Sequence, residues 1–395
     1  MAPHRDPEPK PAAPIARQAF SFALGAFTQR RINRILDLAG HAPRLGWPGP
    51  SDQILAWGNG VSAKRGAWVA AVTGAQLLHI EDAFLRSVLP GRSGHAPLGL
   101  LIDPQACHFD ASRPSALEDL LNTYSLECPA LLERSAAAMA RIAKHKLTKY
   151  SGVPRDALCP KPGFVLVIDQ TRGDASIEKG AANAQTFQQM LAAARAEHPT
   201  AHIVIKTHPE TQLGYRAGHF SAEALDDDME LLTHAIAPQD LFAAARAVYT
   251  VTSQMGFEAI WAGHRPVIFG QPFYAGWGLT QDMQPIHRRG RSLTPAQLFA
   301  GAMIYTRSGM TRAEIRFAVW SMSWINWRQK PAPGATIMPD GKRGVLACGS
   351  ASHCRSFLAA ITRFGFNQNP THISPLWLGA PARTKMGFIT SKMGF

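Results

Sequence analysis

Apolar and polar positions alternate along the chain in patterns that distinguish helices from strands. Apolar residues recur at helical spacing from Phe20 to Leu36, with three arginines on the opposite face, so we expect a helix there. An apolar run at 54–57 leads into a glycine-containing turn at 58–60. A helical pattern at 64–73 and a second apolar run at 76–80 follow. Strand, turn, helix and strand in this order predict a βαβ unit.

The same alternation continues through the second half of the chain. Further strands are predicted at 98–103, 164–169, 201–206, 247–251 and 266–269, and further helices at 115–123, 129–146, 183–198, 241–246 and 257–262. Repeated strand–helix units of this kind form doubly wound parallel sheets. The pattern therefore predicts an α/β protein.

A stretch rich in proline and glycine at 152–163 interrupts the pattern and marks a domain boundary. We expect an N-terminal lobe at 18–160 and a C-terminal lobe at 161–330, both α/β and Rossmann-like. The length of 395 residues suits two domains of roughly 150 residues each. The proline-rich start at 1–17 is expected to be disordered, and 331–395 to be a tail or a truncated further module.

The charge balance points to anionic partners. Lys and Arg number 41 against 28 Asp and Glu, which gives a formal net charge of +13. The basic residues form no dense block, and we find no helix-turn-helix, zinc pattern or interleaving with aromatic residues. Nucleic-acid binding therefore rests on net charge alone. A dispersed solvated surface or docking at an acidic membrane surface remain the other interpretations.

Cysteine usage and hydropathy favour a cytoplasmic protein. The five cysteines are scattered, odd in number and contain no Cys-x-x-Cys pair, so the sequence predicts neither a disulfide framework nor a zinc site. No apolar run approaches the ~20 residues that span a bilayer. The first 17 residues also lack the apolar segment of a secretory signal.

Polar residues follow four predicted strands of the second half. They are Asp169-Gln170, Lys206-Thr207-His208, Thr252-Ser253-Gln254 and Gly270-Gln271. In doubly wound sheets ligands bind beyond the carboxyl ends of the strands. We therefore expect a ligand site where these four ends meet.

Two carboxylate clusters are candidates for catalysis, and each has a purely structural alternative. Glu81 and Asp82 follow a strand, and with Arg86 nearby they suit acid/base work or a structural ion pair. Asp174 lies in the loop that begins at Asp169, where a carboxylate can attack an anomeric carbon or simply cap the next helix.

A third cluster suits a phosphate group. Lys206 and His208 follow one strand, and the hydroxyls of Thr252 and Ser253 follow another. The helix that begins near Gly256 would add its N-terminal dipole. Glu258, one turn into that helix, is placed to reach ribose hydroxyls, although each of these residues alone is more often a cap or loop residue.

Six runs of residues resemble one module of KpsC, a family of retaining β-Kdo transferases of bacterial capsule assembly. In order along the chain they are Glu81–Ser87, Phe109–Ser115, Asp169–Ser176, Lys206–Pro209, Thr252–Ala259 and Gly270–Thr280. The resemblance covers about residues 50–330, and the last run is rich in rare residues. It implies a two-lobed, GT-B-like glycosyltransferase that moves Kdo from CMP-Kdo to a glycolipid primer.

The resemblance also implies roles for particular residues. Asp174 matches the nucleophile that forms a covalent Kdo–enzyme intermediate, and Glu81 and Asp82 match acids on the acceptor side. The matching nucleotide-binding residues are Lys206, His208, Thr252, Ser253, Gln254 and Glu258. We expect further substrate contacts from Arg86, Gln170, Arg172, Gln271, Tyr274 and Trp277, with Arg86 or Arg172 placed to pair with the Kdo carboxylate. No metal or other cofactor is expected. The other expected partners are the inner-membrane surface, where the cytoplasmic protein can dock peripherally, and capsule assembly proteins.

The chain departs from the family pattern on the acceptor side. The family commonly has Gly where Ala83 stands, a Ser-containing run in place of Leu98–Leu100, and tyrosines near His108 and Phe109. These departures, with a single module where the family usually has two, leave an alternative. In that alternative the chain is a non-catalytic module of capsule assembly or export that binds a CMP-sugar or partner proteins.

Overall fold

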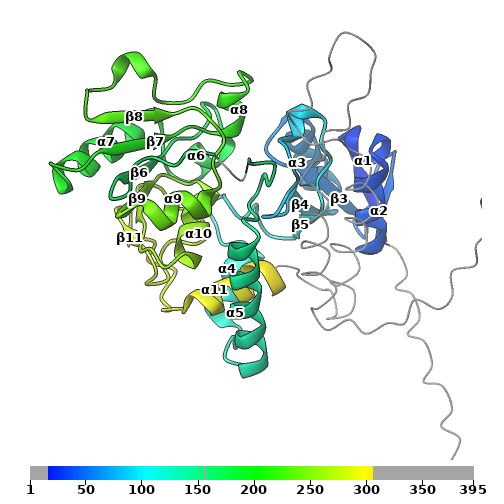
Figure 1. Cartoon of the computed structure of the whole chain (residues 1–395). Helices are drawn as coiled ribbons and strands as arrows, with labels where there is room; N and C mark the ends of the chain where they lie inside the picture. The colour runs from blue at the N-terminus through cyan, green and yellow to red at the C-terminus, as the bar shows by residue number, and fades with distance from the viewer. Residues whose placement is uncertain (1–16, 155–156, 306–395) are drawn as a thin grey trace, which may run out of the picture.

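The computed structural model describes residues 17–154 and 157–305, which form two lobes, each built on a sheet (Figure 1). The N-terminal sheet has five strands in the order β2-β1-β3-β4-β5, and only β5 is antiparallel to its neighbour. Its strands are β1 (Arg17–Ser21), β2 (His41–Arg44), β3 (Gln53–Trp57), β4 (Gln76–Asp82) and β5 (Leu100–Asp103).

The C-terminal sheet has six parallel strands in the order β11-β10-β9-β6-β7-β8. Its strands are β6 (Val165–Ile168), β7 (Ile203–Lys206), β8 (Met229–Leu232), β9 (Ala247–Thr250), β10 (Val267–Ile268) and β11 (Gln281–Asp282). Two parallel-dominated sheets confirm the expected α/β class with two Rossmann-like lobes.

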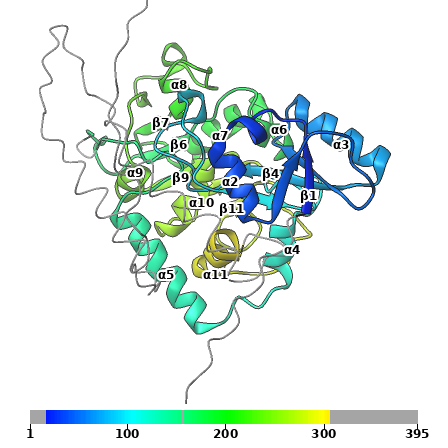
Figure 2. The same cartoon turned by 90° about the vertical axis from the view of Figure 1, so that its right-hand side faces the viewer.

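Short helices connect and cover the sheets (Figures 1 and 2). The first lobe contains α1 (Gly25–Thr28), α2 (Arg30–Leu38), α3 (Val61–Thr73) and η1 (Gly91–Ser93), and α4 (Ala116–Thr123) and α5 (Pro129–Lys144) follow it. The second lobe contains α6 (Ala175–Lys179), α7 (Ala184–Glu197), α8 (Pro209–Gln212), η2 (Ala222–Ala224), α9 (Pro238–Ala244), α10 (Gln254–Trp261), α11 (Pro295–Phe299) and the π-helical η3 (Ala300–Tyr305).

The central strands of the C-terminal sheet are apolar on both faces, as buried parallel strands should be. Along β6, Val165 and Val167 face a core formed with α7, whereas Leu166 and Ile168 face a second core formed with α9 and α10. Helices therefore cover both sides of the sheet and leave its strand ends to carry polar residues.

The βαβ unit β3–α3–β4 and the strand–helix alternation of the second half are confirmed, but the helix expected from Phe20 is wrong at its start. Ala19 and Phe20 belong to β1, which lies between β2 and β3, and both side chains are buried there. Pairing with two strands further along the chain outweighs the helical spacing of the local sequence. The proline-rich start up to residue 16 and the tail 331–395 lie outside the described residues; Arg17 opens β1.

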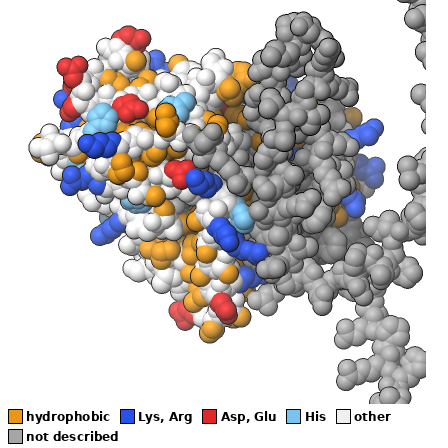
Figure 3. Space-filling model, in the orientation of Figure 1, with side chains coloured by type: hydrophobic (Ala, Val, Ile, Leu, Met, Phe, Trp, Pro, Cys, Tyr) orange, Lys and Arg blue, Asp and Glu red, His pale blue; other side chains and the backbone are white. Residues whose placement is uncertain are grey.

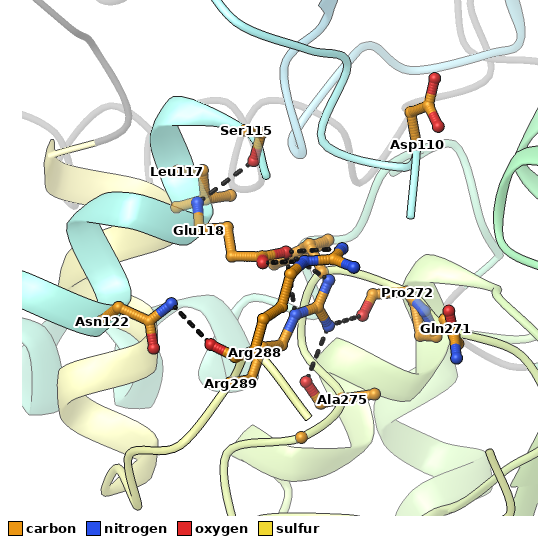
Figure 4. A network of polar contacts seen from close by, with 12 residues as sticks. Asp110, Ser115, Leu117, Glu118, Asn122, Gln271, Pro272, Ala275, Arg288 and Arg289 are labelled. Carbon is orange, nitrogen blue, oxygen red and sulfur yellow. Dashed lines mark hydrogen bonds and ion pairs between the residues drawn. The ribbon is translucent and has the colours of Figure 1, made fainter. Parts of the chain in front are cut away.

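The stretch rich in proline and glycine at 152–163 lies between the two sheets in the chain, but α4 and α5, which precede it, pack with the second lobe. Leu117 and Leu121 of α4 share an apolar cluster with Trp277 and Leu298, and α5 packs on α11. A buried ion-pair network joins the same surfaces (Figure 4). Glu118 of α4 pairs with both Arg288 and Arg289, and its contact with Arg289 spans 2.9 Å. Helices from the first half of the chain are thus part of the C-terminal core.

A second connection between the halves runs through the segment that follows α5. The hydroxyl of Thr148 donates to the Glu258 carboxylate at 2.7 Å, and both side chains are buried. The carbonyl of Lys149 accepts from the backbone N–H groups of Arg86 and Ser87, each at 3.1 Å. One short segment is therefore bonded to α10 on one side and to the loop after β4 on the other.

The Glu118 network should stabilise the chain strongly because removal of the carboxylate leaves buried guanidinium charge without its partner. We expect Glu118→Ala to lower the free energy of unfolding by about 3–5 kcal/mol in urea denaturation. The exposed pair Arg195–Asp226 provides the control, and Asp226→Ala should cost less than about 1 kcal/mol. Equal losses in the two variants would contradict a dominant role for the buried network.

Glu258 should make stability depend on pH. Burial raises its pKa from 4.5 to about 7, so the folded chain binds this proton more tightly than the unfolded chain does. Protonated Glu258 therefore contributes to the free energy of unfolding. This contribution is fully present below about pH 4.5 and is lost as the pH rises through 7.

The hydroxyl of Thr148 favours the charged form of Glu258, so its loss should matter most when Glu258 is ionised. We expect Thr148→Val to cost about 1–3 kcal/mol in urea denaturation near pH 8, and clearly less near pH 5.5. Thr123→Val, which removes an exposed hydroxyl that bonds to the Asp119 carbonyl, is the matched control and should show no such pH dependence. If Thr148→Val lowered the free energy of unfolding equally at both pH values, the hydrogen bond would not depend on the ionisation of Glu258.

Candidate active site

The polar strand ends of the C-terminal sheet meet as expected, because β9, β6 and β7 are parallel neighbours. The Gln170 side chain joins two of these ends. Its amide nitrogen donates to the Thr252 hydroxyl at 3.0 Å, and its oxygen accepts from the Thr252 backbone N–H at 2.9 Å. Gln170 is itself buried, so it fixes the position of Thr252 rather than offering free groups to a ligand.

Asp174 lies four residues past Gln170 and is partly accessible. It caps the N-terminus of α6, where its carboxylate accepts from the Ser176 backbone N–H at 2.9 Å. The Ser176 hydroxyl lies 3.3 Å from that of Thr252, so the cap is tied to the strand ends. The cap interpretation is confirmed, and it holds the carboxylate in a defined position at the sheet edge.

Asp169, by contrast, is structural. Its buried carboxylate accepts from the backbone N–H groups of Gln170, His219 and Phe220 and anchors the loop around Gly218. Burial raises the pKa of Asp169 to about 6, although these N–H donors oppose the shift.

Lys206 and His208 present different donors at the end of β7. Burial lowers the pKa of Lys206 to about 8, and its ammonium donates to the Thr207 carbonyl at 2.8 Å. Burial, with Lys149 nearby, lowers the pKa of His208 to about 3, so its ring is neutral at pH 7. Since Nδ1 accepts from the Glu210 N–H, Nε2 carries the proton. The pair therefore combines one cation with one neutral donor.

The N-terminal lobe contributes two carboxylates from the end of β4. Burial, together with the neighbouring Asp82, raises the pKa of Glu81 to about 7, a value suited to proton transfer near neutral pH. Asp82 pairs with Arg86 at 2.5 Å, and its other oxygen is buried without a hydrogen-bond partner in the described part of the chain. Glu81 lies against the turn after β3, where a Cβ on Gly58 would be 3.3 Å from its carboxylate.

Lys149 interacts electrostatically with carboxylates of both lobes, and sequence reasoning missed it. Burial opposes its charged form, but Tyr150, Asp174, Asp82 and Glu81 outweigh burial and raise the pKa of Lys149. The ammonium lies 5.7 Å from the centre of the Tyr150 ring. No sequence motif marks this residue, because only the packing of the segment after α5 brings it to the site.

Three further residues expected to contact the substrate are buried in the structure. Tyr274 and Trp277 are fully buried, and their polar atoms donate to the carbonyls of Ser253 and Phe273. They shape the loop after β10, and their contact with substrate remains a prediction. Arg86 is also buried, with donors directed to Asp82, Ser87 and the His95 carbonyl, so the ion-pair alternative describes it.

Of the other residues expected to contact substrate, some are hydrogen-bonded within the protein and others are accessible to solvent. Gln254 donates to the Phe84 carbonyl and to Glu258, so both residues help to hold the lobes together. Ser253 caps α10 and stays partly accessible, as does Gln271. Arg172 is exposed beside the strand ends. Their contacts with nucleotide or sugar remain predictions.

Three further features bear on the kind of site this is. Within 17–154 and 157–305, no cluster of His, Cys, Asp and Glu could hold a metal ion. Over the same residues, no helix is both long and apolar enough to cross a bilayer. On the face shown in Figure 3, Lys and Arg side chains are scattered among acidic and apolar ones.

Comparison with known proteins gives consistent matches. A family model described as capsule polysaccharide biosynthesis protein matches residues 148–316. The capsule polysaccharide modification protein LipA of Neisseria meningitidis serogroup B is 36% identical over 270 residues, which are 65% of this chain and 38% of LipA. The lipopolysaccharide-processing protein LpsZ of Rhizobium meliloti is 36% identical over 257 residues, 62% of this chain and 58% of LpsZ. The match thus spans well under two thirds of either relative.

Solved structures extend the match over both lobes. The β-Kdo 2,4 transferase of Thermosulfurimonas dismutans KpsC is 36% identical with a TM-score of 0.68, over 73% of this chain and 90% of that one. The β-Kdo 2,7 transferase of the same KpsC is 26% identical with a TM-score of 0.54, at the same coverage. The likeness in sequence and fold covers nearly all of a solved transferase module. The chain therefore belongs to the KpsC family of capsule polysaccharide glycosyltransferases.

Proposed function

We propose that the chain transfers Kdo from CMP-Kdo to a glycolipid acceptor with retention of configuration. The observation that carries the proposal is that one segment bonded to both lobes brings Lys149 into electrostatic interaction with Glu81 and Asp82 from one lobe and with Asp174 from the other. Retaining transfer through a covalent intermediate needs a nucleophile and an acid/base group on the same reaction centre. The substrate class follows from the solved KpsC transferases.

In this proposal the donor phosphate binds at the ends of β7 and β9. Lys206 supplies positive charge and His208 supplies a neutral N–H, while Thr252 and Ser253 offer hydroxyl oxygens nearby. Charge builds on the phosphate as the bond to the sugar breaks, so preorganised donors there favour the transition state over the ground state. With Lys206 and His208 stabilising the leaving phosphate, the proposed reaction uses no metal or other cofactor.

The first displacement uses Asp174. Its carboxylate attacks the anomeric carbon and forms a C–O ester bond, while the bond between that carbon and the phosphate oxygen breaks and CMP leaves with the electron pair. The cap on α6 orients the carboxylate for this attack. Arg172, exposed beside the same loop, is placed to pair with the sugar carboxylate.

The second displacement uses Glu81. As its base form, Glu81 takes the proton from an acceptor hydroxyl, whose oxygen attacks the anomeric carbon and breaks the ester to Asp174. Two inversions give net retention. A pKa of about 7 suits Glu81 to this step near neutral pH.

The covalent step can be tested by trapping. Asp174→Cys, incubated with CMP-Kdo generated in place, should gain the mass of one Kdo at position 174 in intact-protein and peptide mass spectrometry, because a thioether is not readily displaced. Glu178→Cys, an exposed position on the same helix, should remain unmodified. A folded Asp174→Cys protein that binds CMP but forms no adduct would favour the non-catalytic alternative or another nucleophile.

The role of Glu81 predicts a specific pH dependence. Transfer to acceptor should rise with pH through about 7 as Glu81 loses its proton. Glu81→Gln should remove this limb and lower the transfer rate by about 10²–10⁴-fold, while adduct formation in the Asp174→Cys background persists. Glu133→Gln, an exposed charge change on α5, is the control. An unchanged pH profile in Glu81→Gln would assign the proton transfer to another group.

A further inference from the structure

Helix α3 carries its largest apolar side chains on the side that faces solvent, not on the side that packs against the sheet. Its buried positions are the small or medium residues Ala63, Gly66, Val69 and Ala70. Its solvent side carries Val61, Trp68 and Val72, which are 78%, 60% and 59% exposed. Surface helices ordinarily show the reverse arrangement.

Close packing on the sheet explains the small residues but not the large ones. A Cβ on Gly66 would lie only 3.2 Å from Ile54 of β3, so the buried side of α3 has no room for a bulkier residue. Nothing in that packing calls for Trp or Val on the solvent side. Exposed apolar residues that cluster in this way mark interaction sites.

A second segment extends the exposed surface. Leu45 and Trp47, in the loop after β2, are 75% and 60% exposed. The Trp47 ring meets that of Trp68 edge to face, with centroids 6.2 Å apart. Together Leu45, Trp47, Val61, Trp68 and Val72 form what we call the tryptophan patch. It lies along α3 at the edge of the N-terminal lobe, as Figure 2 shows for the helix.

The charges beside the tryptophan patch are positive. Lys64 and Arg65 are exposed on the same side of α3, and exposed Arg44 directly precedes Leu45. Helix α3 contains no acidic residue. In the described ranges none of these three cations takes part in an ion pair with an acidic side chain. The nearby carboxylate of Asp52 is half-buried and accepts from the Gly49 N–H.

We propose that the tryptophan patch docks the chain on the surface of an anionic lipid bilayer. Tryptophan rings suit the boundary between lipid headgroups and acyl chains, since they combine a large apolar area with one polar N–H. Interleaved lysine and arginine add attraction to anionic headgroups, as does the net charge of +13. A protein partner is less favoured. Specific protein interfaces pair charges of both signs, whereas the charged residues of α3 are all cationic.

Docking in this way also orients the site. Helix α3 begins just after the turn at Gly58, and that turn packs against Glu81. Glu81 lies on β4, the strand that follows α3 in the chain. Docking through α3 would therefore hold Glu81, on the proposed acceptor side, in a fixed position relative to the bilayer. The proposal rests on exposure and charge, and does not depend on the identity of the donor.

The test is co-sedimentation of the full chain with vesicles. The wild-type chain should bind phosphatidylglycerol-containing vesicles, and bind pure phosphatidylcholine vesicles much less, with affinity that falls as salt rises. The double variant Trp47→Ser/Trp68→Ser should lower partition onto the anionic vesicles by about tenfold or more. Lys64→Gln/Arg65→Gln should weaken binding and reduce its salt dependence.

Matched controls change similar side chains elsewhere. Leu158→Ser/Met283→Ser removes exposed apolar groups, and Lys161→Gln/Arg246→Gln removes exposed cations, both in or beside the C-terminal lobe; these variants should bind as the wild type does. The urea unfolding midpoint should be unchanged in every variant, which shows that the chain is folded and keeps this test independent of the proposed function.

Three results would overturn the proposal. The first is equal binding to both vesicle types or none to either, and the second is wild-type binding by the tryptophan double variant. The third is a concentration-dependent dimer in light scattering that the tryptophan substitutions abolish, since a second copy would then be the occupant of the patch.

Discussion

The segment from Thr148 to Tyr150 holds the two lobes in the arrangement that the site requires. Its backbone accepts hydrogen bonds from Arg86 and Ser87 after β4, and the Thr148 hydroxyl bonds Glu258 on α10. The candidate carboxylates come from both sides of this segment. Their separation therefore depends on these hydrogen bonds and on the packing of Phe84, which follows β4, against Phe257 and Phe273 of the C-terminal lobe.

The same segment supplies Lys149, whose positive charge offsets the repulsion among the candidate carboxylates. Carboxylates gathered in a partly buried space repel one another, and burial already raises the pKa of Glu81 to about 7. Lys149 lowers that repulsion for Glu81, Asp82 and Asp174 at once, while Arg86 pairs with Asp82 directly. The pKa of Glu81, near neutral pH, is the property that a proton-transfer group needs.

Local sequence predicted the parts of the fold and site that depend on local structure. Strand–helix alternation indicated the C-terminal sheet, and the polar residues after β6, β7 and β9 indicated its ligand edge, because parallel strands must end together. Phe20 was misassigned because β1 is defined by pairing with strands far along the chain. Lys149 was missed because its position depends on contacts with both lobes. Neither kind of information is present in a local pattern.

Tyr274 and Trp277 have structural partners that no sequence pattern predicted. They were expected to contact the substrate, and in the structure they form buried support for the Ser253 turn, where Tyr274 donates to the Ser253 carbonyl. Arg289 secures the same loop through two carbonyls, and Glu118 of the first half of the chain balances its charge. The proposed nucleotide side of the site thus rests on buried core packing, and Glu81 is connected to it by the hydrogen bonds of Thr148 and Lys149 and by the packing of Phe84 on Phe257. A movement between the lobes would change the distance from Glu81 to Asp174, so the proposed transfer step depends on both lobes, whereas the proposed phosphate contacts lie within the C-terminal lobe alone.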